Sequence, residues 1–172
     1  LSYNKINEIP HVIKYLTNLQ HLNFAHNNIR EIPNEIKYLI NLNIFDISRN
    51  LILEIPNEIR YLSGLTCLNL SRNEIETIPA EIKYLVNLRQ LHLNDNIILT
   101  IPNEIKYLIN LINLNLSYNN ITIIPDNIKY LNKLQHLYIK YNYINKIPLS
   151  IKHLTKLLLL DVSSNNICYI PY

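Results

Sequence analysis

The sequence predicts an α/β solenoid, with a parallel β-sheet along one side and short helical segments along the other. Two observations predict this fold. The chain repeats with a period of 23 residues, and apolar residues in each period first alternate and then recur at every third position. The single glycine, Gly64, excludes a phosphate-cradling loop and a dinucleotide-binding motif. The length of 172 residues suits one domain, so we expect a single array over residues 1–172, with seven full periods and partial units at both ends.

The prolines mark the period, because each step between them is 23 residues without an insertion. They are Pro10, Pro33, Pro56, Pro79, Pro102, Pro125, Pro148 and Pro171. Isoleucine stands directly before each proline, and leucines follow the first seven prolines at six and nine residues. A unit of this size cannot bury its own apolar side chains, so identical units must stack on one another.

Each unit combines two spacings. Leu114 and Leu116 are two residues apart, which is the spacing of a strand, and Asn115 between them must point to the opposite face. Ile128 and Leu131 follow a proline in steps of three, which favours a 3₁₀ or short helical turn with proline in its first turn. Since the helical side is the bulkier one, we expect the stack to curve with its strands on the concave side.

An asparagine stands six residues before the proline in every unit. We expect these amides to form a ladder along the array, because a side chain with both a donor and an acceptor can satisfy backbone groups of its own turn and of a neighbouring turn. The expected ladder comprises Asn27, Asn50, Asn73, Asn96, Asn119, Asn142 and Asn165.

The unit matches a known motif in both halves. Residues 88–96 fit LxxLxLxxN, and residues 98–111 continue as IxxIPxxIxxLxxL. The chain thereby resembles the leucine-rich-repeat family, and its period resembles the intracellular class related to Ras-binding scaffold proteins and their plant relatives. The resemblance implies a curved solenoid whose concave parallel sheet binds other proteins. The chain departs from the class at the two positions after the isoleucine that follows each proline. Glycine and a small polar residue are common there in the class, whereas this chain has Lys-Tyr, Arg-Tyr or Lys-His.

The residues that flank the inward leucines differ from unit to unit, as a recognition surface requires. Their most distinctive members form what we call the aromatic patch: Tyr118, His136, Tyr138, Lys140 and Tyr141, with Tyr143 close by in the sequence. Tyrosine suits an interface because it contributes large contact area at small entropic cost. We therefore expect a protein partner at His92, Asn115 and this patch, although the 13 tyrosines of the chain also allow a purely compositional explanation.

Charged residues allow further interpretations. Arg72 and Asp95 share a column in adjacent units and predict a surface ion pair, whereas Arg49 stays open for an acidic partner. On the helical side, a row of Lys-Tyr pairs could suggest nucleic acid, but a parallel row of glutamates makes a self-compensated, solvated surface the preferred reading. Residues 1–104 carry 9 basic and 11 acidic side chains, and residues 105–172 carry 7 and 2, so the later part could attract an acidic surface.

The sequence favours no chemistry of its own. His92 and His136 lie two strands apart without a third ligand, so we expect no metal site, and no serine has a base placed by the pattern. We therefore expect no enzymatic activity, no catalytic residue and no cofactor, and the lack of a long apolar run predicts no membrane span. Cys67 and Cys168 lie too far apart in the array to bridge, which favours a reducing, cytoplasmic location.

Two alternatives to a protein-binding scaffold stay open. Neither end of the sequence shows a recognisable cap, and exposed apolar ends would allow the array to associate with further repeats or with copies of itself. The array could also serve as the recognition arm of a larger enzyme.

Overall fold

The computed structural model describes residues 1–169, and these residues confirm the predicted solenoid. Short 3₁₀ helices alternate with three-residue strands along the described chain. The helices are η1 His11–Tyr15, η2 Asn34–Tyr38, η3 Asn57–Tyr61, η4 Ala80–Tyr84, η5 Asn103–Tyr107, η6 Asp126–Tyr130 and η7 Leu149–His153. The strands are β1 His21–Asn23, β2 Ile44–Asp46, β3 Cys67–Asn69, β4 Gln90–His92, β5 Asn113–Asn115, β6 His136–Tyr138 and β7 Leu159–Asp161.

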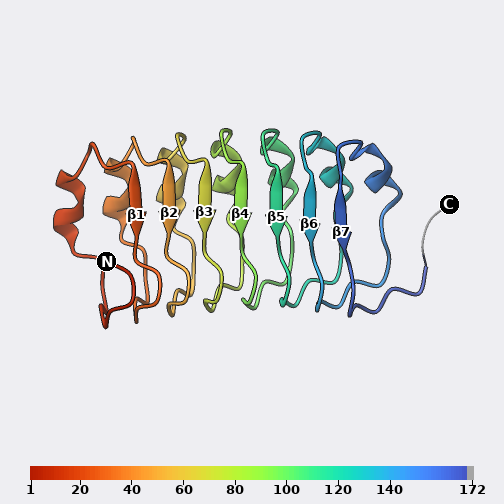
Figure 1. The fold of residues 1–172 in the computed structure, drawn as a ribbon, viewed down its shortest axis with the longest axis horizontal. Coiled ribbons are helices and arrows are strands. Elements are labelled where there is room, and N and C mark those ends of the chain that lie inside the picture. Colours follow the sequence, from red (N-terminus) through yellow and green to blue (C-terminus); the bar gives the residue numbers. More distant parts are fainter. Residues whose placement is uncertain (170–172) are drawn as a thin grey trace.

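The strands form one open, parallel sheet in the order of the sequence, β1 to β7. The register advances by one period at each step, so that Leu91 of β4 pairs with Leu114 of β5 and Leu114 with Leu137 of β6. Figure 1 shows the strands side by side in a row, with the helices forming a second row along the array. Within the array, each side chain therefore has its counterparts directly beside it in the neighbouring units.

The spacing of three within each unit follows from the hydrogen bonds of the 3₁₀ turn. The N–H of Ile105 donates to the carbonyl of Pro102 at 3.1 Å, Leu108 donates to Ile105 at 3.0 Å, and Leu111 donates to Leu108 at 2.9 Å. Proline itself lies one residue outside the helix, because Pro102 is the N-cap with extended dihedrals. The expectation that proline occupies the first helical turn is thus wrong by one position. The helix uses the proline carbonyl as an acceptor, and a residue at this position needs no N–H donor.

The apolar columns form a continuous core between the sheet and the helices. Leu91, Leu114 and Leu116 are fully buried, as is the helical Ile105. Full burial of each such side chain contributes about 1.5–3 kcal/mol, which a unit gains only when both of its neighbours cover it.

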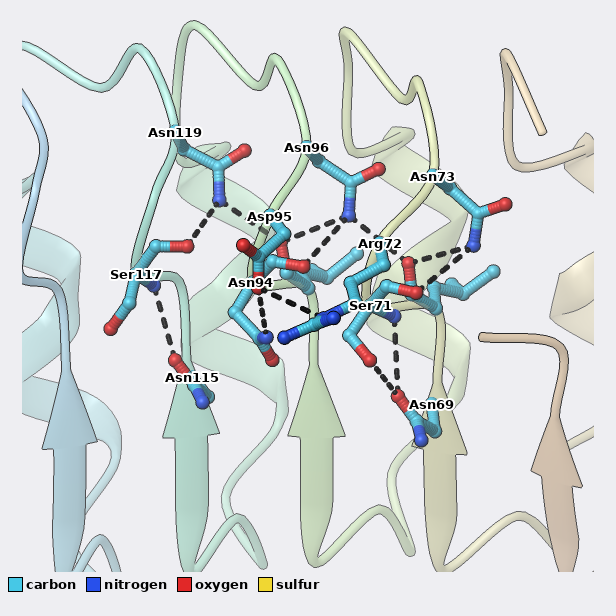
Figure 2. Close-up of polar contacts among 12 residues, drawn as sticks. Asn69, Ser71, Arg72, Asn73, Asn94, Asp95, Asn96, Asn115, Ser117 and Asn119 are labelled. Carbon is cyan, nitrogen blue, oxygen red and sulfur yellow. Dashed lines mark hydrogen bonds and ion pairs between the residues drawn. The ribbon is translucent and has the colours of Figure 1, made fainter. Parts of the chain in front are cut away.

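The asparagine of each unit binds backbone groups of two units (Figure 2). The Nδ2 of Asn96 donates to Leu93 O in its own unit and to Leu70 O in the preceding unit, both at 3.0 Å. Its Oδ1 accepts the N–H of Ile75 at 3.0 Å. The same set of bonds recurs at every ladder position: Asn27, Asn50, Asn73, Asn96, Asn119, Asn142 and Asn165.

The residue before Asn4 and before each ladder asparagine has a left-handed backbone, with φ between 51° and 57°. The series is Tyr3, His26, Arg49, Arg72, Asp95, Tyr118, Tyr141 and Ser164. A residue other than glycine adopts this conformation at a cost of about 1–2 kcal/mol. The bonds of the asparagine that follows hold the turn in place, and the turn directs these side chains outward at one level along the array.

We expect Asn96→Ala to lower the free energy of unfolding by about 2–3 kcal/mol, because it leaves the buried N–H of Ile75 unpaired and removes one bond from each of two carbonyls. Urea unfolding measures this loss. Asn4→Ala is the matched control: Asn4 occupies the same column but is exposed and bonds only to Leu1 and Ser2, so its loss should stay below about 0.5 kcal/mol. If both variants lost the same free energy of unfolding, the hydrogen bonds of the amide between units would not be the source of the stability.

Candidate functional site

The outward side of the sheet, which we call the strand face, carries the first and the last side chain of each three-residue strand. In five strands the last residue is Asn or Asp, and its side-chain oxygen accepts the N–H of the residue two positions later. These capping residues are Asn23, Asp46, Asn69, Asn115 and Asp161. The column formed by the last residue of each strand is therefore partly structural, a role that the sequence did not lead us to expect. The signal was present, since Asn or Asp followed two residues later by Ala or Ser is typical of this local turn.

Asn115 has less freedom to bind a partner than the sequence suggested. Its Oδ1 accepts the N–H of Ser117 at 3.1 Å (Figure 2). Its amide NH₂ donates to no group among the described residues and remains available on the strand face.

Two strands depart from this pattern, β4 with His92 and β6 with Tyr138. Neither side chain has the amide or carboxylate oxygen that accepts the backbone N–H two positions later in the other five strands. The residue two positions later also differs, since Asn94 and Lys140 stand where the capped units have Ala or Ser. His92 is half-buried, and burial lowers the pKa of its imidazole, although Asp46 acts in the opposite direction. Burial therefore disfavours the protonated form of His92.

The aromatic patch is assembled around Lys140. The rings of Tyr118 and Tyr141 are stacked, with centroids 4.4 Å apart and an interplanar angle of 14°. The Nζ of Lys140 lies 5.6 Å from the ring centroid of Tyr118 and 5.9 Å from that of Tyr141. On β6, the rings of His136 and Tyr138 are nearly parallel at 6.3 Å.

The backbone explains why the rings of Tyr118 and Tyr141 are in contact. Tyr118 and Tyr141 are both left-handed residues directly before ladder asparagines, so their side chains leave the chain in the same direction in adjacent units. Tyr3 and His26 stack at 4.0 Å for the same reason at the other end of the array.

The other predicted positions lie around this cluster. Asn115 belongs to β5, beside β6, whereas His92 belongs to β4 and makes no ring contact with the patch. Tyr143 is exposed, and its backbone N–H donates to Ile121 O at 2.9 Å. The structure thus groups Tyr118, Lys140 and Tyr141 tightly and leaves His92 apart from them.

A buried hydroxyl lies beside the patch. Ser117 is 2% exposed, and its Oγ has no hydrogen-bond partner among the described residues. By contrast, the hydroxyl of Ser71 donates to Asn69 at 2.8 Å, and Figure 2 shows the Ser117 hydroxyl turned away from Asn115. Ser117 lies opposite Lys140, because Leu116 donates to Tyr138 and Tyr118 donates to Lys140.

Several of the other charged side chains are engaged in contacts within the chain. Six cations of the helical side lie over the ring of the adjoining tyrosine at 5.0–5.3 Å: Lys14, Lys37, Arg60, Lys83, Lys106 and Lys129. The predicted pair between Arg72 and Asp95 is confirmed, with Nε and Oδ2 3.8 Å apart. Within residues 1–169 the other ion pair joins His11 and Glu35 at 2.9 Å, and the pKa of Glu35 is lowered chiefly by that hydrogen bond.

Other kinds of site are not found in the described part of the chain. Across residues 1–169, no three His, Cys, Asp or Glu side chains gather in a way that could hold a metal ion, and no helix has the length and apolar character needed to cross a membrane. Cys67 and Cys168 are both free, and burial raises the pKa of the Cys67 thiol.

The fold and the variable strand face define a solenoid repeat protein, and comparisons with known proteins name its family. A leucine-rich-repeat family model matches residues 40–98, 86–144 and 109–167, and a single-repeat model matches residues 18–39. The chain therefore belongs to the leucine-rich-repeat family, as the motifs predicted. Members of this family generally act as non-catalytic scaffolds for protein interaction.

Solved structures agree with this assignment. A leucine-rich-repeat protein of Leptospira interrogans is 31% identical with a TM-score of 0.84, and the match covers 100% of this chain and 53% of that one. The ectodomain of the Arabidopsis thaliana receptor kinase GASSHO1/SCHENGEN3 is 32% identical (TM-score 0.89), with 96% and 21% covered. The Arabidopsis receptor kinase HAESA is 33% identical (TM-score 0.86), with 97% and 29% covered. No curated protein matches the chain.

We expect Ser117→Ala to leave the free energy of unfolding unchanged or to raise it by up to about 1 kcal/mol, because the substitution removes a buried hydroxyl that makes no bond. Ser71→Ala is the matched control and should lower it by about 1 kcal/mol, since Asn69 loses a donor. Urea unfolding of both variants provides the comparison. A clear loss of stability in Ser117→Ala would mean that its hydroxyl has a structural partner after all.

Proposed function

We propose that this chain is a non-catalytic scaffold that binds another protein on its strand face, which we expect to be concave. The binding surface is centred on the aromatic patch, with Asn115 and His92 as outlying contacts. One observation carries the proposal: Tyr118, Lys140 and Tyr141 form an assembled cluster beside Tyr138, which has no capping role in its own turn.

Rigidity supports this function. The side chains of the patch stand on strands whose register is fixed by both neighbours and on turns held by buried asparagines. A surface that is already ordered loses little conformational entropy on binding, so more of the contact energy remains as affinity. Exposed tyrosines such as Tyr118 and Tyr141 add large contact area with a polar tip.

The structural neighbours support a protein or peptide as the ligand. HAESA was solved with a peptide hormone and a co-receptor, and GASSHO1/SCHENGEN3 with CASPARIAN STRIP INTEGRITY FACTOR 2. The chain spans about half of the Leptospira protein and under a third of these two receptors, so what the whole protein does, including a role as the recognition arm of an enzyme, belongs to this proposal.

We further propose an intracellular location and a relation to the Ras-group class of repeats. The free thiols of Cys67 and Cys168 support a reducing compartment, and the 23-residue period supports the class.

A second candidate function is assembly through the apolar edge of the first unit. Leu16 is 51% exposed there, whereas Leu39, one period later, is fully buried. Leu16 lines a hollow of about 690 Å³ together with Leu1, Val12 and Phe24. A further repeat, from this protein or from a second copy, would cover these side chains.

We expect Tyr138→Ala combined with Tyr141→Ala to abolish most partner capture while changing stability only slightly, because both rings contribute contact area on the strand face. Immobilised chain is used to capture proteins, which are quantified by mass spectrometry. Tyr84→Ala combined with Tyr107→Ala is the matched control, since it removes two half-exposed tyrosines from the helical side. If the captured proteins are the same for both double variants, the patch is not the binding surface.

Assembly through the apolar edge predicts association that increases with protein concentration and that Leu16→Glu suppresses, because a charge would have to be buried at the contact. Sedimentation velocity at several concentrations measures this. A monomer at every concentration would rule out self-association through this edge.

A further inference from the structure

Lys140 is the cation at the centre of the aromatic patch, and its surroundings indicate which partner it suits. We propose that the patch binds an acidic segment of the protein partner and that Lys140 receives a carboxylate of this segment. The inference rests on the proposed function, because it specifies the chemistry of the partner at the same surface.

In the unbound chain, two tyrosine rings hold the ammonium of Lys140. Its side chain starts in the unit of β6 and reaches back over the unit of β5, where Nζ lies 5.6 Å from the ring centroid of Tyr118. Tyr141 holds the ammonium from its own unit at 5.9 Å. Attraction between the cation and the two ring faces orients the ammonium without neutralising its charge.

No carboxylate in residues 1–169 lies within ion-pair distance of Lys140, since the two ion pairs there are His11–Glu35 and Arg72–Asp95. The acidic side chain on the next strand is Asp161, whose Oδ1 accepts the Ser163 hydroxyl at 2.6 Å. The pKa of Asp161 is lowered first by this hydrogen bond and only to a smaller degree by the charge of Lys140. The Oδ1 of Asp161 is thus used in its own turn, and Lys140, which forms no ion pair among the described residues, remains available to an external carboxylate.

The charge distribution of the chain favours the same partner. Residues 105–172 carry 7 basic and 2 acidic side chains, a net charge of +5, whereas residues 1–104 carry 9 and 11, a net charge of −2. An acidic segment would therefore be attracted toward the part of the array that holds the patch.

The buried hydroxyl of Ser117 offers a second contact. Ser117 lies opposite Lys140 in the same column, and the side chain of Lys140 crosses its unit to reach Tyr118. Ser117 is 2% exposed, so this contact requires the Lys140 side chain to shift aside on binding, after which the hydroxyl donates to the second carboxylate oxygen. Binding would then satisfy a group that lacks a partner among the described residues.

A peptide carboxylate fits these observations better than a nucleic acid does. Single-stranded nucleic acids bind by stacking bases on open aromatic faces along a basic groove. Here Tyr118 and Tyr141 cover each other, and six basic side chains of the helical side lie over tyrosines. The net charge of +3 is also small for a nucleic-acid-binding domain.

Selection of displayed random peptides on the immobilised chain tests the proposal. We expect the enriched peptides to gain Asp and Glu, and we expect Lys140→Glu to reverse the preference toward Lys and Arg. Lys129→Glu is the matched control, because it makes the same change of charge on the helical side and should leave the acidic preference intact. Lys140→Gln removes the charge without introducing the opposite one, and urea unfolding verifies that all variants fold.

Fluorescence anisotropy then measures an enriched acidic peptide directly. We expect Lys140→Gln to weaken its binding by about tenfold or more and Ser117→Ala to weaken it less, with little effect of Lys129→Glu. A copy of the peptide with phosphoserine in place of its acidic residue separates a preference for carboxylate from one for phosphate. Tighter binding of phosphoserine, or of a single-stranded RNA at the same salt concentration, would overturn the proposal.

The outcomes distinguish this inference from the proposed function. Peptides that are enriched without an acidic bias and still depend on Tyr138 and Tyr141 would contradict the inference and leave the function standing. Peptides that depend on neither tyrosine nor on Lys140 would contradict both. Failure of any peptide to be enriched would overturn the inference, and the capture experiment above would still decide on the function.

Discussion

The hydrogen bonds of one buried asparagine per unit are the constraint on which the rest of this structure depends. Each strand has only three residues, too few to hold a sheet together by itself. Asn96 adds bonds to Leu70, Leu93 and Ile75, which belong to two different units. Leu93 O in turn also accepts a bond from Asn119, so adjacent amides share the same carbonyls. Each turn therefore closes fully only against a neighbour, and stability belongs to the array and not to the unit.

The same constraint creates the candidate site. The left-handed residue before each asparagine is held by the bonds of the turn, and its side chain is directed outward regardless of its type. Where tyrosine occupies this position in successive units, as at Tyr118 and Tyr141, the rings are forced into contact. The left-handed turn, which allows the units to stack on one another, thus also positions side chains that lie outside the strands.

The sequence predicted the fold because its signals are local and repeated. The steps of three were readable as 3₁₀ turns, since each isoleucine and leucine in them is also a donor to the residue three positions earlier. The site was less predictable. The direction of Lys140 depends on whether its ammonium is attracted more by two rings or by Asp161, a choice between rotamers that spacing does not reveal. The capping role of Asn115 was missed for a similar reason, because a side chain that faces outward can still bond to its own backbone.

The two strands without a capping residue show how a structural column becomes a binding surface. Where Asn or Asp caps the turn, the next outward residue is Ala or Ser, a side chain small enough to lie against the cap. In β4 and β6 the cap is replaced by His92 and Tyr138, and the next residue is Asn94 or Lys140. Each of these units gives up a hydrogen bond worth about 1 kcal/mol and gains two larger outward side chains. The unit tolerates this loss because its buried asparagine keeps its hydrogen bonds, as Asn142 does beside Lys140. Variation on the strand face is therefore possible wherever the ladder behind it is complete.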